Sequence, residues 1–245
     1  LIMLKDKIAV VTGGGQGLGK HAAKTLAENG VKIVIADVNM ETAEQAATEL
    51  SAHAETTAIL LDVRNEGDVQ KAFADVAQKL GGIDILVNNA AIVPHFRWGS
   101  TLWPPISDMP HDFWDSVIQT NLYGTFNCTK HAIPHMKNRE GGHIINIWGG
   151  GGTRALAYMV TKNGIRTFTR YVAEEVRDDN ICVVTFSPRF AIATETAPQE
   201  AKDRMPSPEV LGDGFVLSAQ LPMVSSGQCF AHEYGKLILE APMDG

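Results

Sequence analysis

Tyr158 and Lys162 stand four residues apart in a segment, 158–177, that we expect to form a helix. Side chains at positions i and i+4 of a helix lie on the same face. A phenol, with an unperturbed pKa of about 10, is a poor acid or base at neutral pH, but a nearby ammonium group stabilises the phenolate and lowers that pKa. The pair therefore predicts a tyrosine that exchanges a proton with a substrate oxygen.

A glycine-rich stretch, "TGGGQGLG" at 12–19, has the composition of a phosphate-binding loop. Gly13, Gly17 and Gly19 follow a predicted strand and lead into a predicted helix, although their G-x-x-x-G-x-G spacing differs from the G-x-G-x-x-G dinucleotide pattern. Glycines let the backbone approach a pyrophosphate, which then lies at the positive end of the helix. We therefore expect this loop to bind a dinucleotide.

Asp37 stands at the end of the second predicted strand, directly after 32–36 and eighteen residues after Gly19. A carboxylate at this position accepts hydrogen bonds from the ribose hydroxyls of a dinucleotide and repels a 2′-phosphate. Because no Lys or Arg occurs in the next three residues, the sequence favours NAD over NADP. A role for Asp37 as the N-cap of the following helix is the alternative.

Short apolar runs rich in Val and Ile alternate with longer periodic segments along most of the chain, which predicts an α/β fold with a parallel sheet. Continuous hydrophobicity in the strands indicates helices on both faces of that sheet. The region from 191 to 223 is irregular and predicts a mobile flap, near 191–210, followed by a helix. We expect one domain over 1–245. The predicted strands are 8–12, 32–36, 57–61, 83–88, 143–147, 182–187 and one near 228–230, and the predicted helices include 41–50, 66–80 and 158–177.

The composition limits the classes of partner. A formal net charge of -7 without a Lys/Arg cluster opposes binding to nucleic acid or to an anionic membrane. Cys128, Cys182 and Cys229 are far apart, which favours reduced thiols in the cytoplasm. No apolar stretch approaches the ~20 residues of a membrane span. His131 and His135 have the spacing of a zinc pair but no third ligand, so we expect no metal site.

Six motifs in order resemble those of the short-chain dehydrogenase/reductases, in the form whose length matches this 245-residue chain. They are "TGGGQGLG" at 12–19, "LDV" at 61–63, "NNAA" at 88–91, "NLYGTF" at 121–126, "YMVTK" at 158–162 and "SP" at 187–188. The resemblance implies a doubly wound Rossmann-type sheet of about seven strands, with NAD across the carboxyl ends of the strands. It also implies a homotetramer or dimer that packs through the helices before and after the strand at 143–147.

The same resemblance assigns roles to individual residues. Tyr158 and Lys162 should reach the reacting centre, and Asn121 should hold a water that links the lysine to solvent. The residues expected to bind the cofactor are Gly13, Gln16, Gly17, Leu18 and Gly19 in the loop, Asp37 and Asn89 at the riboses, Asp62 and Val63 at the adenine, and Ile192 and Thr194 at the nicotinamide.

One family feature is missing, because the family has a serine at the end of the strand before Tyr158 and this chain has Trp148 and Gly149 there, with Gly149 at the catalytic position. Loss of one donor to a developing oxyanion lowers turnover roughly 100- to 1000-fold without abolishing it. Candidate substitutes are the backbone N–H groups of 149–152 and the Thr153 hydroxyl, followed by the Trp148 indole. A surface loop with no role at the site is the alternative. We expect hydride transfer to survive with a rebuilt oxyanion contact.

The segment from 92 to 112 is longer than the family usually allows and carries Phe96, Trp98 and Trp103. These aromatics suit the wall of a pocket for a ring-shaped ligand, although they could instead anchor the loop or a subunit contact. Arg97, Arg154 and Arg189 could bind a carboxylate, or be solvated surface residues.

The resulting hypothesis is an NAD-dependent oxidoreductase that interconverts a secondary alcohol and a ketone on a bulky cyclic small molecule, with aromatic or carboxylated compounds as narrower candidates. The alternatives are a non-redox isomerase or lyase, and a catalytically weakened NAD-binding regulatory subunit.

Overall fold

A single mixed sheet forms the centre of the protein, in a computed structural model that describes residues 3–93, 103–149, 155–195, 197, 199–233 and 235–240. The strand order is β3-β2-β1-β4-β5-β6-β7-β8, in which β1 to β7 are parallel and β8 is antiparallel to β7. The strands are β1 (Ile8–Thr12), β2 (Lys32–Asp37), β3 (Thr56–Leu60), β4 (Ile85–Asn88), β5 (Gly142–Ile147), β6 (Ile181–Ser187), β7 (Cys229–Glu233) and β8 (Lys236–Leu239).

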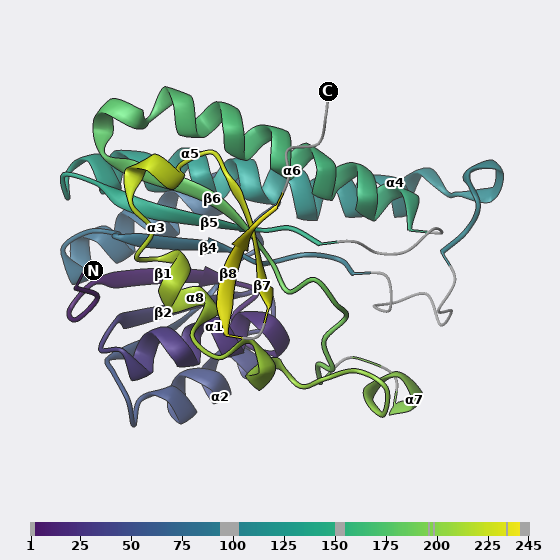
Figure 1. The fold of residues 1–245 in the computed structure, drawn as a ribbon, viewed down its shortest axis with the longest axis horizontal. Coiled ribbons are helices and arrows are strands. Elements are labelled where there is room, and N and C mark those ends of the chain that lie inside the picture. The colour runs from purple at the N-terminus through teal and green to yellow at the C-terminus, as the bar shows by residue number, and fades with distance from the viewer. Residues whose placement is uncertain are drawn as a thin grey trace.

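Helices cover both faces of the sheet (Figure 1), with α3 to α6 on one side and α1, α2 and α8 on the other. The helices are α1 (Gly17–Glu28), α2 (Met40–Leu50), α3 (Glu66–Leu80), α4 (His111–Ile118), α5 (Gly124–Lys137), α6 (Leu156–Glu175), α7 (Gln199–Lys202) and α8 (Gly214–Ser218), with a π-helical turn, Gln119–Tyr123, between α4 and α5. In the described part of the chain, no helix is both long enough and apolar enough to cross a membrane.

Burial on both faces of the sheet explains why the central strands are continuous runs of apolar residues. Every residue of β1 and β6 is buried, because helices pack against both faces of each strand. The side chains of Asn39 and Asn65 cap α2 and α3 by accepting hydrogen bonds from backbone N–H groups in the first turn of each helix. Gly81 ends α3 in the left-handed conformation, with φ 98°.

The predicted fold class is confirmed, and the first six predicted strands occur with bounds shifted by no more than two residues. The sequence did not predict β8. This strand is short and mostly exposed at the sheet edge, so it lacks both the alternation and the buried run that mark strands in a sequence.

Chain order reverses between β1 and β4, so the loops that follow these two strands diverge at the carboxyl edge of the sheet. Ligands of open α/β sheets bind at such a point. The segment near 191–210, called the flap below, contains α7 and leads through a 3₁₀ turn, Pro208–Leu211, to α8. Its mobility stays a prediction.

Candidate active site

The glycine loop between β1 and α1 approaches the loop after β4 so closely that side chains would not fit. A Cβ on Gly19 would lie 2.2 Å from the Gly13 carbonyl oxygen, and one on Gly13 would lie 2.9 Å from Ala90 Cα. Asn89 Nδ2 fixes this approach by donating to the carbonyl oxygens of Thr12 and Gly13, each at 3.0 Å. The expected cofactor-binding residues Gly13, Gly19 and Asn89 therefore meet at one place.

Asp37 lies against the same loop and is only 9% exposed. One carboxylate oxygen accepts the Gly15 N–H at 3.0 Å, and the other accepts the Asn39 N–H at 3.0 Å. Asn39, rather than Asp37, caps α2. The helix-cap alternative for Asp37 is therefore wrong, and the carboxylate is directed at the glycine loop.

Four further expected cofactor residues lie in two places, Gln16 and Leu18 at the start of α1 and Asp62 and Val63 after β3. Gln16 is the residue before α1, and Leu18 packs on the core from its first turn. Val63 is buried and held by Asn127, whose Nδ2 donates to its carbonyl at 3.0 Å. Asp62 accepts the Arg64 Nε–H at 2.9 Å, and this hydrogen bond holds the pKa of Asp62 below its usual value.

The flap reaches the start of α1. Ile192 is buried in the core, and the Thr194 methyl group lies 3.0 Å from the point where a Cβ on Gly17 would be. Glu195, which the sequence did not single out, accepts the Gly17 N–H at 2.7 Å through Oε2. Gly17 itself has φ 57°, a conformation that favours glycine.

Tyr158 and Lys162 lie one helical turn apart near the start of α6, and both are buried. Lys162 Nζ donates to the Ile147 carbonyl, at the end of β5, at 2.8 Å. The same nitrogen is 5.4 Å from the centre of the Tyr158 ring. The helix thus directs both groups at the carboxyl edge of the sheet, as their spacing predicted.

Burial dominates the protonation of this pair. It raises the pKa of Tyr158 and lowers the pKa of Lys162 to about 7, because a low-dielectric environment disfavours both charged forms. The expected lowering of the tyrosine pKa is therefore wrong for this structure. A buried Tyr158 keeps its proton at neutral pH, which is the form that can donate a proton.

Asn121 is fully buried in the π-helical turn between α4 and α5. Its Oδ1 accepts the Ile92 N–H at 2.7 Å, and its Nδ2 donates to the Ile92 carbonyl at 3.1 Å and to Thr161 Oγ1 at 3.2 Å. These bonds tie α6, next to Lys162, to the chain after β4. π-Helical turns occur frequently at functional sites.

Gly149 lies beside the tyrosine hydroxyl, since a Cβ on Gly149 would be 4.0 Å from Tyr158 Oη. The neighbouring Trp148 packs its ring under the Arg166 guanidinium, 4.6 Å from the ring centre. Its indole Nε1 is buried and finds no acceptor among the described residues. The other expected substrate residues on this side, Thr153 and Arg154, lie outside the described residues, as does Trp98.

An apolar cluster borders Tyr158 on its other side. Trp103 is buried and meets the rings of Phe113 and Tyr158 edge to face, with centroids 5.0 Å and 6.2 Å away. Ile92, Val93 and Met109 pack against this cluster. The structure thus brings Trp103, an expected pocket residue, into contact with the tyrosine.

Arg189 does not face this cluster as an unpaired cation. Its Nη1 lies 2.7 Å from Glu233 Oε2, and its Nε lies 3.9 Å from Glu240 Oε1. Arg189 is therefore held in ion pairs with two carboxylates, and a role for it in binding an anionic substrate stays a prediction.

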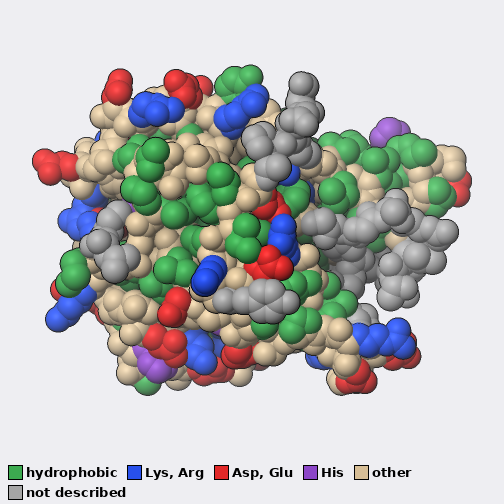
Figure 2. Space-filling model, in the orientation of Figure 1, with side chains coloured by type: hydrophobic (Ala, Val, Ile, Leu, Met, Phe, Trp, Pro, Cys, Tyr) green, Lys and Arg blue, Asp and Glu red, His purple; other side chains and the backbone are tan. Residues whose placement is uncertain are grey.

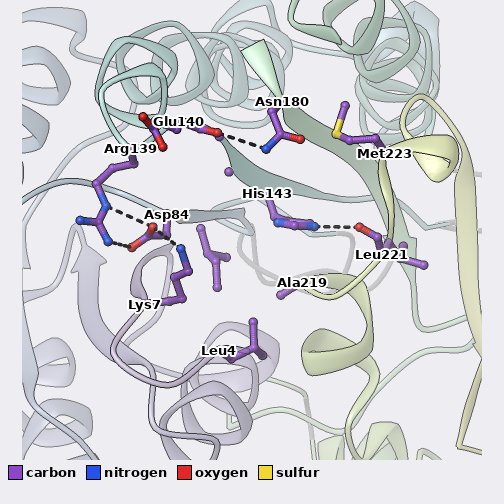
Figure 3. Close-up of a pocket in the computed structure, with 13 residues that line it drawn as sticks. Leu4, Lys7, Asp84, Arg139, Glu140, His143, Asn180, Ala219, Leu221 and Met223 are labelled. Carbon is purple, nitrogen blue, oxygen red and sulfur yellow. Dashed lines mark hydrogen bonds and ion pairs between the residues drawn. The ribbon is translucent and has the colours of Figure 1, made fainter. Parts of the chain in front are cut away.

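A second polar cluster lies at the opposite, amino-terminal edge of the sheet (Figure 3), beside a cavity of about 250 Å³. Asp84 is its centre and accepts hydrogen bonds from Lys7 Nζ, the Ile8 N–H and the Arg139 guanidinium, all between 2.9 and 3.3 Å. These contacts join the starts of β1 and β4 to the chain after α5. The expected site residues are at the other edge.

Comparisons with known proteins agree with this geometry. A family model described as short chain dehydrogenase matches residues 7–205. An uncharacterized oxidoreductase of Staphylococcus aureus is 33% identical over 208 residues, covering 83% of this chain and 86% of the relative. One of Thermotoga maritima is 34% identical over 201 residues, covering 79% and 74%.

The fold is also similar to those of solved structures. A short-chain type dehydrogenase/reductase from Mycobacterium marinum has a TM-score of 0.82 at 25% identity, covering 95% of this chain and 96% of that one. A 3-ketoacyl-(acyl-carrier-protein) reductase from Brucella melitensis, complexed with NADH, has a TM-score of 0.81 at 27% identity, covering 93% and 97%. The chain belongs to the short-chain dehydrogenase family of oxidoreductases.

Proposed function

We propose that this protein is an NAD-dependent oxidoreductase that interconverts a secondary alcohol and a ketone on a bulky cyclic small molecule. The observation that carries the proposal is the buried pair on α6, with Tyr158 beside Gly149 and Lys162 on the Ile147 carbonyl. A buried lysine that donates to a neutral carbonyl is costly for a fold and is typical of a site that uses its charge.

The residues at the glycine loop fit a dinucleotide. The crowding at Gly13 and Gly19 brings the loop's backbone to the end of β4, and a carboxylate of the flap already lies on the Gly17 N–H where a phosphate oxygen would bind. We favour NAD over NADP because the buried Asp37 carboxylate is directed at this loop and would repel a 2′-phosphate.

The bound dinucleotide supplies the hydride in reduction and accepts it in oxidation. In reduction, Tyr158 donates its hydroxyl proton to the carbonyl oxygen of the substrate as that oxygen becomes an alkoxide. The charged form of Lys162 stabilises the phenolate that remains, and the phenolate takes a proton back from solvent. Asn121 holds the start of α6 in place for these steps, and oxidation reverses them.

We propose that Gly149 takes the place of the serine that the family has beside the tyrosine, because a Cβ on Gly149 would lie 4.0 Å from Tyr158 Oη. The backbone N–H groups of 149–152 and the Thr153 hydroxyl remain our candidates for the oxyanion contact. Trp148 ranks behind them, since its ring is held by Arg166.

The apolar cluster next to Tyr158 supports the proposed substrate class. Trp103 and Phe113 are buried in this cluster, and we propose that the partly buried Ile92, Val93 and Met109, which pack on them, line the apolar wall for a ring compound. A carboxylated ring would need a cation outside the described residues, Arg97 or Arg154, because Arg189 is paired. Equal KM values for carboxylated and neutral versions of one cyclic ketone would remove the carboxylate from the proposal.

We also propose a homo-oligomer, a tetramer or dimer, that packs through α5 and α6. Phe126, Val160 and Tyr171 leave large apolar side chains exposed on these helices. Light scattering should give a multiple of the 26.5 kDa chain mass, and Phe126→Glu should reduce it. An unchanged mass for this variant would place the contact elsewhere.

We propose a cytoplasmic protein without a nucleic-acid partner. On the face in Figure 2, acidic and basic side chains are interspersed, and the three cysteines are free thiols. Recovery from a secreted fraction, or retention on DNA at physiological salt, would contradict these two statements.

The experiment that tests the function follows NADH absorbance with a panel of cyclic ketones and the reverse reaction with the alcohols, each with NAD(H) and NADP(H). We expect turnover with at least one cyclic pair and a lower KM for NAD(H). Dinucleotide binding without turnover on any pair would favour the regulatory subunit, and substrate conversion without an absorbance change would favour the isomerase or lyase.

A further inference from the structure

Glu195 connects the flap to the cofactor loop across 178 residues of sequence. Its Oε2 accepts the Gly17 N–H at 2.7 Å, a distance typical of a charge-assisted hydrogen bond. Gly17 is the first residue of α1, a helix of twelve residues. The carboxylate therefore occupies the amino-terminal end of the helix that follows the glycine loop.

The backbone N–H of Gly17 is a favourable position for an anion. The first backbone N–H groups of a helix have no partner within the helix, and the helix dipole makes that end positive. The glycines that precede α1 bring the dinucleotide's pyrophosphate to the same groups in our proposed function. A single N–H cannot direct a hydrogen bond of full strength at both a carboxylate and a phosphate oxygen.

The flap holds Glu195 in place through its backbone. Lys202 Nζ donates to the Glu195 carbonyl at 3.0 Å, and the Ala197 N–H donates to the Thr194 carbonyl at 3.1 Å. The Ala193 N–H donates to the Pro206 carbonyl at 2.8 Å, which closes the flap on itself. The Glu195 residue is exposed, so its carboxylate can return to water at little cost.

We propose that the Glu195 carboxylate is an internal competitor for the pyrophosphate-binding N–H of Gly17, so that dinucleotide binding must displace it. The inference rests on the proposed dinucleotide binding. A protein whose binding-competent state is only partly populated binds with an affinity reduced by that fraction. Glu195 thus weakens binding of the cofactor and eases its release.

The test is calorimetric titration of the protein with NAD, ADP-ribose and adenosine, which needs no turnover. Glu195→Gln keeps the shape and removes the charge, and Glu195→Ala removes the hydrogen bond as well. The matched control is Glu200→Gln, which makes the same charge change at an exposed position of α7 in the same flap.

We expect Glu195→Ala to bind NAD and ADP-ribose roughly tenfold more tightly than the natural protein, with Glu195→Gln in between. Adenosine, which has no pyrophosphate, should bind all proteins equally, and Glu200→Gln should match the natural protein.

Two results would overturn the inference while leaving the proposed function intact. NAD affinity that is unchanged or weaker in Glu195→Ala would show that the carboxylate does not compete. An equal gain for adenosine would show a general change of the flap instead. If none of the proteins binds NAD or ADP-ribose, the proposed function itself is wrong, and the inference falls with it.

Discussion

The two edges of the sheet treat a buried charge in opposite ways. At the amino-terminal edge, Asp84 is 3% exposed and receives two cations and a backbone N–H (Figure 3). At the carboxyl edge, Lys162 is also 3% exposed, yet it donates to the neutral Ile147 carbonyl. Among the described residues, no carboxylate lies within ion-pair distance of Lys162.

The difference separates a structural cluster from a chemical one. A fully paired carboxylate keeps its charge and joins the strands that supply its partners. Burial of an unpaired amine lowers its pKa, here to about 7 for Lys162, and the protonated amine destabilises the fold. Such a group is retained for what its charge can do, so the amino edge should respond to mutation in stability and the carboxyl edge in turnover.

The largest effect should come from Tyr158→Phe, which removes the proton donor and keeps the ring. We expect turnover to fall roughly 10²- to 10⁴-fold, with little change in unfolding free energy because the hydroxyl is not part of the apolar contact with Trp103. Steady-state kinetics and urea unfolding measure the two quantities. The matched control is Tyr171→Phe, an exposed tyrosine of the same helix, which should leave both unchanged. Similar turnover in the two variants would contradict the assignment.

Asp84→Asn should show the opposite pattern. The change leaves Lys7 and Arg139 without their carboxylate, and we expect a loss of about 2–4 kcal/mol in unfolding free energy, reduced from a fully buried pair because both cations are about a third exposed. Turnover at a temperature where the variant is folded should stay within about twofold. Asp75→Asn, at an exposed i,i+4 pair with Lys71, should change stability by no more than about 0.5 kcal/mol. A loss of turnover without a loss of stability in Asp84→Asn would contradict the structural role of Asp84.

Gly149→Ser should give a smaller effect, and in the favourable direction. Among the described residues that are not its chain neighbours, the nearest atom to a new Cβ is Tyr158 Oη at 4.0 Å, so these residues leave room for a side chain. A hydroxyl there would add a donor to the developing oxyanion, and we expect turnover to rise roughly tenfold. Gly149→Ala supplies the Cβ without the hydroxyl and should show no gain. Equal rates in the two variants would mean that Gly149 is not at the oxyanion.

Much of this arrangement follows from local sequence patterns. The i,i+4 spacing places Tyr158 and Lys162 together, and Asp37 and the glycines meet because consecutive parallel strands end at one edge. Those patterns also predict the parallel sheet, since buried strands and amphipathic helices carry distinct periodicities.

The contacts that patterns did not predict depend on the folded surroundings. Glu195 contacts Gly17 because the folded chain brings the flap to the start of α1. The residues next to Glu195 in the sequence do not indicate this contact. The protonation of Tyr158 was predicted in the wrong direction because pair spacing reports the nearby ammonium but not the burial of both groups. The sequence likewise does not predict the ion pairs of Arg189, because its partners, Glu233 of β7 and Glu240 after β8, are distant in the chain.

The central claim is that Lys162 is kept for its chemistry at a cost to the fold, and Lys162→Met tests it. The unfolded chain holds this proton up to the ordinary pKa of 10.5, whereas the folded protein releases it from about pH 7. Between these values the unfolded state binds more protons, so Lys162 makes stability rise with pH across that window.

The decisive measurement is the unfolding free energy of Lys162→Met and of the natural protein at pH 7 and at about pH 9.5. We predict that the variant is more stable by about 2–4 kcal/mol at pH 7, that the difference shrinks at the higher pH, and that the variant has lost turnover. A variant that is less stable at pH 7, or one that keeps its turnover, would contradict the account.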